Sequence, residues 1–264
     1  MRSCLFAGLI LVVTSASLAS PAVLVVDQAN SSVSVQLCLT VGSTQCDTDV
    51  SPVAGSITVG LDCLTNPAAL TLHDFNLQLT NTLNLNLNYG FIIGRFDAVV
   101  SNTALHYATP GTPQPPTPLT LGAFTYSNVP ETATGNMSYT STNLVCAALQ
   151  AAMRPCADNI DLSTLGVNTI TLDGTALATG RNIAMVITVN STVPIDPNNP
   201  ALGTLTVTGT VRANGVVPLP SADDFAGVMV GAITQPDLVC ESDINFDGVV
   251  NGLDVRAYLQ AIGL

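Results

Sequence analysis

The sequence has very little charge and almost no basic side chains. Its 264 residues include six arginines and no lysine against 18 acidic residues, and charged residues make up 9% of the chain. An ordinary soluble domain has about 25% charged residues. So acidic a chain lacks the cationic surface that attracts nucleic acid and anionic membranes. We therefore expect no nucleic-acid partner.

The residues and motifs of catalysis are also scarce. There is no tryptophan, aromatic residues make up 5% of the chain, and the two histidines are His73 and His106. His73 precedes Asp74 in a strand-like stretch, where neighbouring side chains point to opposite faces. The sequence contains no Gly-x-Ser-x-Gly and no His-Glu-x-x-His motif. We predict no catalytic residue, and the sequence favours a non-enzymatic protein.

No apolar run is long enough to span a membrane, which takes about 20 residues. Residues 1–19 instead have the features of a secretory signal, with Arg2, an apolar run over residues 5–13, and Ser17 and Ala19 before the cleavage site. Cleavage after Ala22 is the second choice. Removal of the signal leaves five basic against 18 acidic residues, a balance of −13. We predict a secreted, extracellular or cell-surface protein without a membrane span after cleavage.

Cysteine use agrees with export. Of the seven cysteines, Cys4 leaves with the signal, and an even number in an exported chain indicates disulfides. Six cysteines allow 15 pairings. We predict Cys38–Cys46 and Cys146–Cys156, which are close in sequence, and Cys63–Cys240, which would tie the tail to the body. Zinc is disfavoured because there is no Cys-x-x-Cys pair and both histidines lie far from any cysteine.

Alternation of apolar and polar residues dominates the chain between residues 23 and 219. This period of two indicates strands with one dry and one wet face. Asp173-Gly174 and Asn214-Gly215 are among the expected turns. The predicted fold is mainly β, an antiparallel β-sandwich or barrel, with one short helix over residues 143–153 covering an end of the sheet. Strands are expected near residues 33–41, 57–63, 83–88, 169–172, 183–189 and 205–211.

A twelve-residue stretch from Asp243 to Asp254 has the spacing of an EF-hand-type calcium loop. Oxygen side chains occupy positions one, three, five, nine and twelve, a backbone carbonyl serves at position seven, and Gly248 at position six permits the tight turn. An alternative is an Asp/Asn/Gly-rich turn that binds no metal. The predicted Ca²⁺ ligands are Asp243, Asn245, Asp247, Val249 through its carbonyl, Asn251 and Asp254.

Residues 243–264, this loop and the helix predicted after it, resemble one repeat of a type I dockerin. The resemblance implies calcium binding and, more weakly, attachment to a cohesin-like or other surface protein. Two features differ from the dockerin pattern. Docking on a cohesin normally uses two repeats, and Phe246 stands where small or polar residues are usual. No family resemblance is found for the rest of the chain.

The predicted organisation is a signal over residues 1–19, a β domain over 20–219, a linker over 220–240 and the dockerin-like repeat over 241–264. Within the linker, residues 222–233 are expected either to add a strand or to stay flexible. Residues 236–242 show no helical period. The first functional hypothesis is a non-enzymatic β protein whose calcium-binding tail serves stabilisation or surface attachment. The alternatives are an extracellular carbohydrate-active protein associated with polysaccharide degradation and a β-barrel that binds an apolar ligand.

Overall fold

The computed structural model describes residues 20–195 and 199–264, so the predicted signal lies outside the described residues. Twelve strands form one sheet, in which every pairing is antiparallel. None of the described helices is long and apolar enough to cross a membrane. The strands are β1 (Ala22–Val26), β2 (Ser32–Val41), β3 (Ser43–Leu61), β4 (Ala69–Leu79), β5 (Leu83–Asn88), β6 (Arg95–Tyr107), β7 (Thr117–Pro118), β8 (Ala123–Ser141), β9 (Ala157–Asp161), β10 (Val167–Thr179), β11 (Asn182–Pro194) and β12 (Gly203–Val216).

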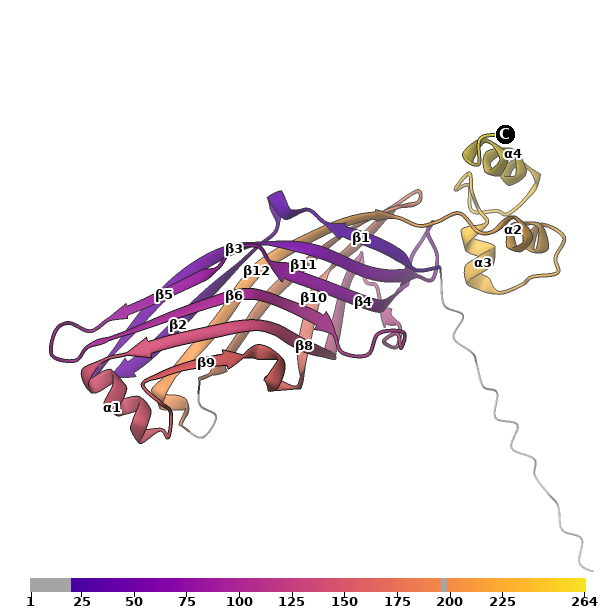
Figure 1. Ribbon diagram of the computed structural model, residues 1–264. Helices are drawn as coiled ribbons and strands as arrows, with labels where there is room; N and C mark the ends of the chain where they lie inside the picture. The colour runs from indigo at the N-terminus through magenta and orange to yellow at the C-terminus, as the bar shows by residue number, and fades with distance from the viewer. Residues whose placement is uncertain (1–19, 196–198) are drawn as a thin grey trace, which may run out of the picture.

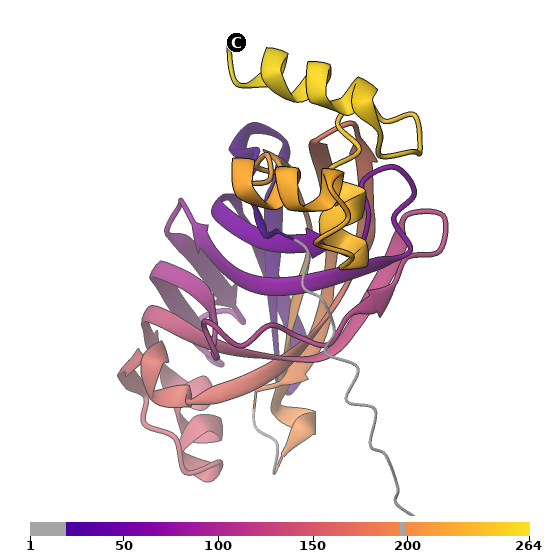
Figure 2. The same cartoon turned by 90° about the vertical axis from the view of Figure 1, so that its right-hand side faces the viewer.

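The strand pairing closes on itself. From β3 it runs through β2, β12, β11, β10, β8 and β6 to β4, and β4 pairs with β3 again. Figures 1 and 2 show the result as an elongated, sandwich-like body of long curved strands. The prediction of a mainly antiparallel β fold is confirmed. Short 3-10 helices η1 (Gln28–Asn30), η2 (Leu162–Leu165) and η3 (Pro200–Leu202) lie between strands.

The core lies on the inward face of the closed sheet, as strand alternation requires. In β5, Leu83, Leu85 and Leu87 are each 1% exposed, whereas the asparagines that alternate with them face solvent. Burying each leucine contributes about 1.5–3 kcal/mol. Asn84, Asn86 and Asn88 therefore lie on the outer face of the sheet.

Two expected turns proved wrong, because both lie within strands. Asp173-Gly174 lies in β10 and Asn214-Gly215 in β12. A Cβ at Gly174 would collide with the Val186 carbonyl oxygen, and one at Gly215 would collide with the Val23 carbonyl oxygen. These glycines permit close approach of neighbouring backbones, a role that sequence alone does not distinguish from a turn.

Helix α1 (Asn143–Ala151) covers the end of the body opposite the C-terminal helices (Figure 1). It ends at Ala151, slightly before the predicted limit of residue 153. Val145 and Leu149 are buried in the main core, with exposures of 0% and 5%. The predicted covering helix is confirmed.

The three cysteine pairs are the predicted ones. Cys38–Cys46 joins directly paired residues of β2 and β3, and Cys146–Cys156 joins α1 to the residue before β9. Cys63–Cys240 connects positions 177 residues apart, with its Cα atoms 5.3 Å apart. This third bridge ties the C-terminal segment to the body, as the sequence predicted.

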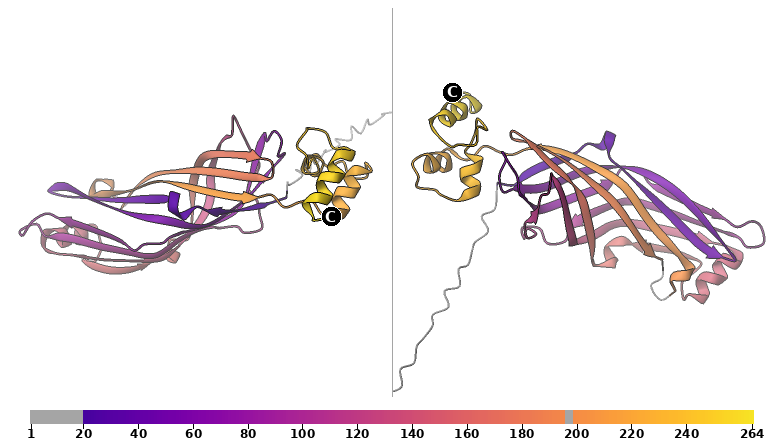
Figure 3. Two further views of the ribbon diagram at one scale, coloured as in Figure 1. Left: turned by 90° about the horizontal axis from the view of Figure 1, so that it is seen from above. Right: turned by 180° about the vertical axis from the view of Figure 1, so that it is seen from behind.

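The segment predicted as a linker carries two helices, α2 (Ala222–Met229) and α3 (Pro236–Glu241). The expectation of a strand or a flexible segment at the first, and of no helix at the second, was therefore wrong. Ser221 caps α2 by accepting a hydrogen bond from the backbone N–H of Asp224, and Pro236 suits the first turn of α3. Helix α4 (Gly252–Ala261) follows the loop as predicted. Figure 3 shows the three helices gathered at one end of the body.

Tyr126 gives a testable property of the core. Its hydroxyl donates to the Leu70 carbonyl oxygen at 2.5 Å and accepts from the Leu72 backbone N–H at 3.0 Å, and burial raises its pKa to about 12. Because the folded pKa exceeds the unfolded value of about 10, the stabilising contribution is complete below pH 10 and is lost as pH rises through 12.

We therefore expect stability to fall between pH 10 and 12, in step with a late-titrating tyrosine in the ultraviolet spectrum. A Tyr126→Phe variant should lose that spectroscopic step. A full tyrosine complement titrating near pH 10 in the folded protein would contradict the prediction.

Candidate calcium loop and its junction with the body

The loop from Asp243 to Asn251 connects α3 to α4 and rests on a small core of its own. Phe225 of α2, Ile244 of the loop and Tyr258 of α4 form this cluster. The rings of Phe225 and Tyr258 stack with centroids 4.3 Å apart and an interplanar angle of 5°. This pairing explains why α2 forms, because its apolar side finds a partner on a helix that follows it by more than 20 residues.

At the first loop positions, side-chain oxygens accept hydrogen bonds from backbone N–H groups of the loop. The Asp243 Oδ1 atom accepts from the Asp247 N–H at 3.2 Å, and Oδ2 accepts from the Gly248 N–H at 2.9 Å. Asn245 Oδ1 also accepts from the Asp247 N–H, at 3.0 Å, and Asp247 Oδ1 accepts from the Val249 N–H, at 2.9 Å. Gly248 has φ +87°, the left-handed conformation predicted for position six.

Asp254 closes the loop from the first turn of α4. It is 0% exposed, and its Oδ1 accepts from the Ile244 and Asn245 N–H groups at 2.8 and 3.1 Å. Its Oδ2 accepts from the Asn251 N–H at 2.8 Å, while Asn251 Oδ1 accepts from the Leu253 N–H at 2.8 Å. Asn251 and Asp254 thereby form a capping box. In this geometry Asp254 caps the N-terminus of α4. Its role as the calcium ligand at loop position twelve stays a prediction.

The donor set fits a hard cation. Asp243, Asn245 and Asp247 place side-chain oxygens around one tight turn, and the Val249 carbonyl and Asn251 side chain follow directly, joined by an Asn251 Nδ2 donation to that carbonyl at 3.1 Å. Oxygen ligands suit Ca²⁺, whereas no thiolate is near because the six cysteines of the described chain are paired. Within residues 20–195 and 199–264, no three His, Cys, Asp or Glu side chains converge on a common metal position. Any cation would therefore depend on the amide and carbonyl oxygens as well.

The β body holds this loop through side chains that sequence reasoning missed. The Thr65 hydroxyl, just after β3, donates to Asp243 Oδ2 at 3.0 Å. Arg181, between β10 and β11, donates from Nε to the Val217 carbonyl at 3.0 Å and from Nη1 to the Glu241 carbonyl at 3.1 Å. Its Nη2 donates to the Pro218 carbonyl. The Arg181 guanidinium is therefore hydrogen-bonded to the chain both before α2 and at the end of α3. Burial lowers the pKa of Arg181, and the negative charge of Glu241 raises it.

Phe246 is the unusual loop residue, and the structure explains it. Its ring packs against the main core of the body and lies beside Gly180, where an added Cβ would come within 3.3 Å of the ring. The backbone of Phe246 has φ +59°, a conformation that is uncommon for a bulky side chain. Glycine would adopt that conformation without a Cβ penalty but would lose the contact. Phe246 therefore joins the loop to the β body of the same chain.

His73, His106 and Glu131 are the titratable side chains of the β body that were considered as possible bases or acids. His106 Nε2 lies 3.2 Å from the Thr134 hydroxyl, and burial lowers the pKa of His73. Neither histidine is hydrogen-bonded to a carboxylate within the described residues. Burial raises the pKa of Glu131, a single acid inside β8.

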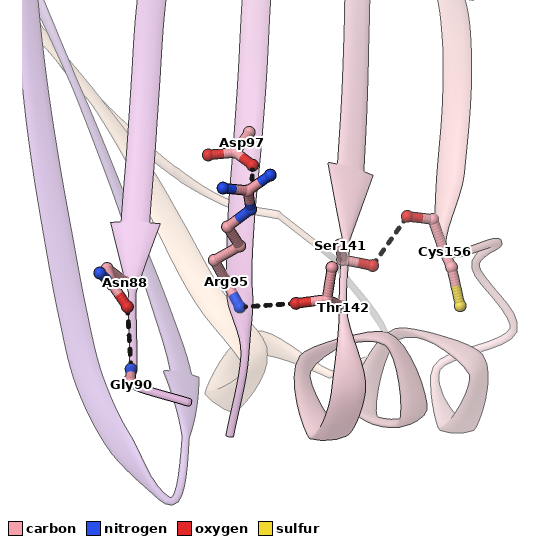
Figure 4. Close-up of polar contacts among 7 residues, drawn as sticks. All are labelled: Asn88, Gly90, Arg95, Asp97, Ser141, Thr142 and Cys156. Atoms are coloured by element: carbon pink, nitrogen blue, oxygen red, sulfur yellow. Dashed lines mark hydrogen bonds and ion pairs between the residues drawn. The ribbon is translucent and has the colours of Figure 1, made fainter. Parts of the chain in front are cut away.

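A depression of about 330 Å³ lies beside α1, lined in part by Arg95 and Thr142. Figure 4 shows the polar contacts near this depression. The Arg95 backbone N–H donates to Thr142 Oγ1 at 3.1 Å, and the Arg95 side chain pairs with Asp97 at 2.9 Å. Ser141 Oγ donates to the Cys156 carbonyl at 2.7 Å. These contacts join β6, β8 and the disulfide-bonded turn, so the polar groups named here have structural partners.

Comparison with models of known protein families finds no match to this chain, and comparison with curated protein sequences finds no match either. The functional argument therefore rests on the loop and its junction with the body.

Proposed function

We propose that the protein is a secreted or cell-surface, non-enzymatic β protein whose C-terminal loop binds Ca²⁺ and so holds the tail on the β body. One observation carries the proposal. Asp243, at loop position one and 3% exposed, shares its Oδ2 between Gly248 of the loop and Thr65 of the body. Ordering this carboxylate orders the loop and its contact with the body together.

The charge of the tail gives a reason for a cation there. Residues 221–264 contain seven acidic residues and one basic residue, Arg256. Like charges in so small a unit oppose its compaction. Bound Ca²⁺ would supply two positive charges at Asp243 and Asp247, with Asn245, Asn251 and the Val249 carbonyl completing an oxygen shell. Because metal binding and folding are coupled in small modules, this binding free energy would act as folding free energy.

Attachment to an external surface protein is a second candidate, favoured by the exposed apolar side of α4. Val255 and Leu259 of α4 and Ile262 just after it recur at helical spacing, and they are 38%, 40% and 45% exposed. Such a row on one helix suits a protein partner. Stabilisation within the chain is preferred, because Phe246 and Asp243 already contact the body.

Calorimetric titration with Ca²⁺ tests the proposal. We expect saturable one-site binding by the mature protein and no binding by an Asp243→Ala/Asp247→Ala variant, because the double substitution removes the two carboxylates of the first loop turn. Amide exchange of residues 241–264 should be slower with Ca²⁺ than with EGTA.

Asp223→Ala is the matched control, since Asp223 lies in the first turn of α2 and carries the same charge outside the loop. It should retain binding. Absence of binding by the unaltered protein, or equal binding by the double variant, would refute the proposal.

A further inference from the structure

A buried carboxylate at the junction meets the residue that follows the predicted cleavage site. Glu241, the last residue of α3, is 2% exposed. Its Oε1 accepts from the Ser20 backbone nitrogen at 2.6 Å, and its Oε2 accepts from the Ser20 hydroxyl at 2.7 Å. The two residues are 221 positions apart in the chain. Both carboxylate oxygens are thus directed at one residue of the N-terminal segment.

In the unprocessed chain this carboxylate is attracted by the nearby guanidinium of Arg181, whose pKa it raises, but within the described residues it forms no ion pair. Within the described residues Arg95 and Asp97 form the one ion pair, and Arg181 directs its N–H groups to carbonyl oxygens. A buried carboxylate that forms no ion pair is costly. The C-terminal end of a helix is also the end that disfavours a negative charge. In the precursor, Ser20 can offer an amide N–H and a hydroxyl, neither of which is charged.

We propose that cleavage between Ala19 and Ser20 gives Glu241 a directly bonded cation, so that the new α-ammonium group of Ser20 forms an ion pair with Glu241 and holds the C-terminal module on the body. A signal peptidase uses one water molecule to hydrolyse the peptide bond. Ala19 keeps the new carboxylate, and the amino group of Ser20 takes up the released proton. Removal of the signal would then complete the tertiary structure as well as release the protein.

The position of β1 distinguishes the two candidate cleavage sites. Ala22 is the first residue of β1, is 1% exposed and pairs with Val59 of β3. Cleavage after Ala22 would remove the first residue of a core strand and would remove Ser20, the partner of Glu241. Cleavage after Ala19 leaves the strand intact and puts the new terminus at the carboxylate. The inference rests on the export signal that is part of the proposed function, but not on calcium binding.

The first test is the N-terminal residue of the exported protein by mass spectrometry, for which we expect Ser20. The second compares two full mature chains, one beginning at Ser20 and one retaining Ala19. The retained alanine moves the ammonium group away from Glu241 but keeps the Ser20 amide and hydroxyl. Amide exchange in residues 236–264 should show the opening equilibrium at least about tenfold less favourable in the Ser20 chain.

Glu241→Gln, placed in both chains, is the control. It removes the negative charge and should abolish the difference between them. An exported chain that begins at Val23, equal exchange of the two chains with Glu241 present, or a difference that survives Glu241→Gln would each overturn the proposal. The comparison is made with Ca²⁺ and with EGTA, so a failed calcium titration leaves this result interpretable.

Discussion

Replacing Asp254 by alanine is expected to unfold the C-terminal module while the β body stays folded. The substitution leaves the backbone N–H groups of Ile244, Asn245 and Asn251 without the acceptor they now share. Hydrogen bonds to a charged group contribute about 1.5–3 kcal/mol each, so losing all three is expected to cost about 4.5–9 kcal/mol. The module's own core is the Phe225, Ile244 and Tyr258 cluster, and it cannot offset a loss of that size.

Amide exchange measures this effect, with residues 243–262 expected to exchange quickly and the strands to remain protected. The measurement is made in EGTA, so that it reports the cap and not metal binding. Asp224→Ala is the matched control, because Asp224 occupies the corresponding position of α2, where it bonds to Ser221 in an exposed setting. There we expect about 1 kcal/mol. Equal, small effects of both substitutions would refute the central role of Asp254.

Removing the Cys63–Cys240 bridge by a double alanine substitution is expected to cost about 5 kcal/mol of unfolding free energy. In the chain-entropy account, a crosslink stabilises more as the loop it closes lengthens, and this one closes a separation of 177 residues. The bridge also lies beside the Thr65–Asp243 contact, so its loss should release the tail before the body unfolds.

The Cys38–Cys46 bridge gives the comparison, since it closes a separation of 8 residues. Its removal is expected to cost about 2.5 kcal/mol in the same account. Denaturant unfolding of both double variants measures the two losses, and amide exchange of residues 241–264 identifies the tail. If loss of the 38–46 bridge proved the more damaging, the view of the 63–240 bridge as the main fastening of the tail would be wrong.

Local patterns determined much of this protein directly. Alternation at Leu83, Leu85 and Leu87 specifies an inward face whatever the sheet's topology, because successive strand residues point to opposite sides. The cysteine spacing predicted all three bridges, and residues 243–254 predicted a loop with Gly248 at a positive φ followed by a helix. These properties depend on residues near one another in the chain, except the Cys63–Cys240 bridge, which was the pair left after the two short-range bridges.

The errors arose where packing between distant segments decided the outcome. Helix α2 is short and contains Gly227, so its intrinsic helical signal is weak, and it forms against Tyr258 of α4. Gly174 resembles a turn residue beside Asp173, yet it serves the close approach of β11 inside a strand. Intrinsic preference is a weak guide at such positions, because tertiary contacts outweigh it.

The sequence by itself determined the strand faces, the two short-range bridges and the oxygen-rich loop, because periodicity and spacing are local. Only the tertiary structure decided what the loop touches. Thr65 meets Asp243 across 178 positions and Ser20 meets Glu241 across 221. Those meetings follow from the closure of the sheet and from the Cys63–Cys240 bridge, which bring the start of β1, the end of β3 and the tail to one end of the body. Contacts between residues so far apart leave no periodic pattern in the sequence. The contact of Glu241 with Ser20 is therefore seen only in the folded chain.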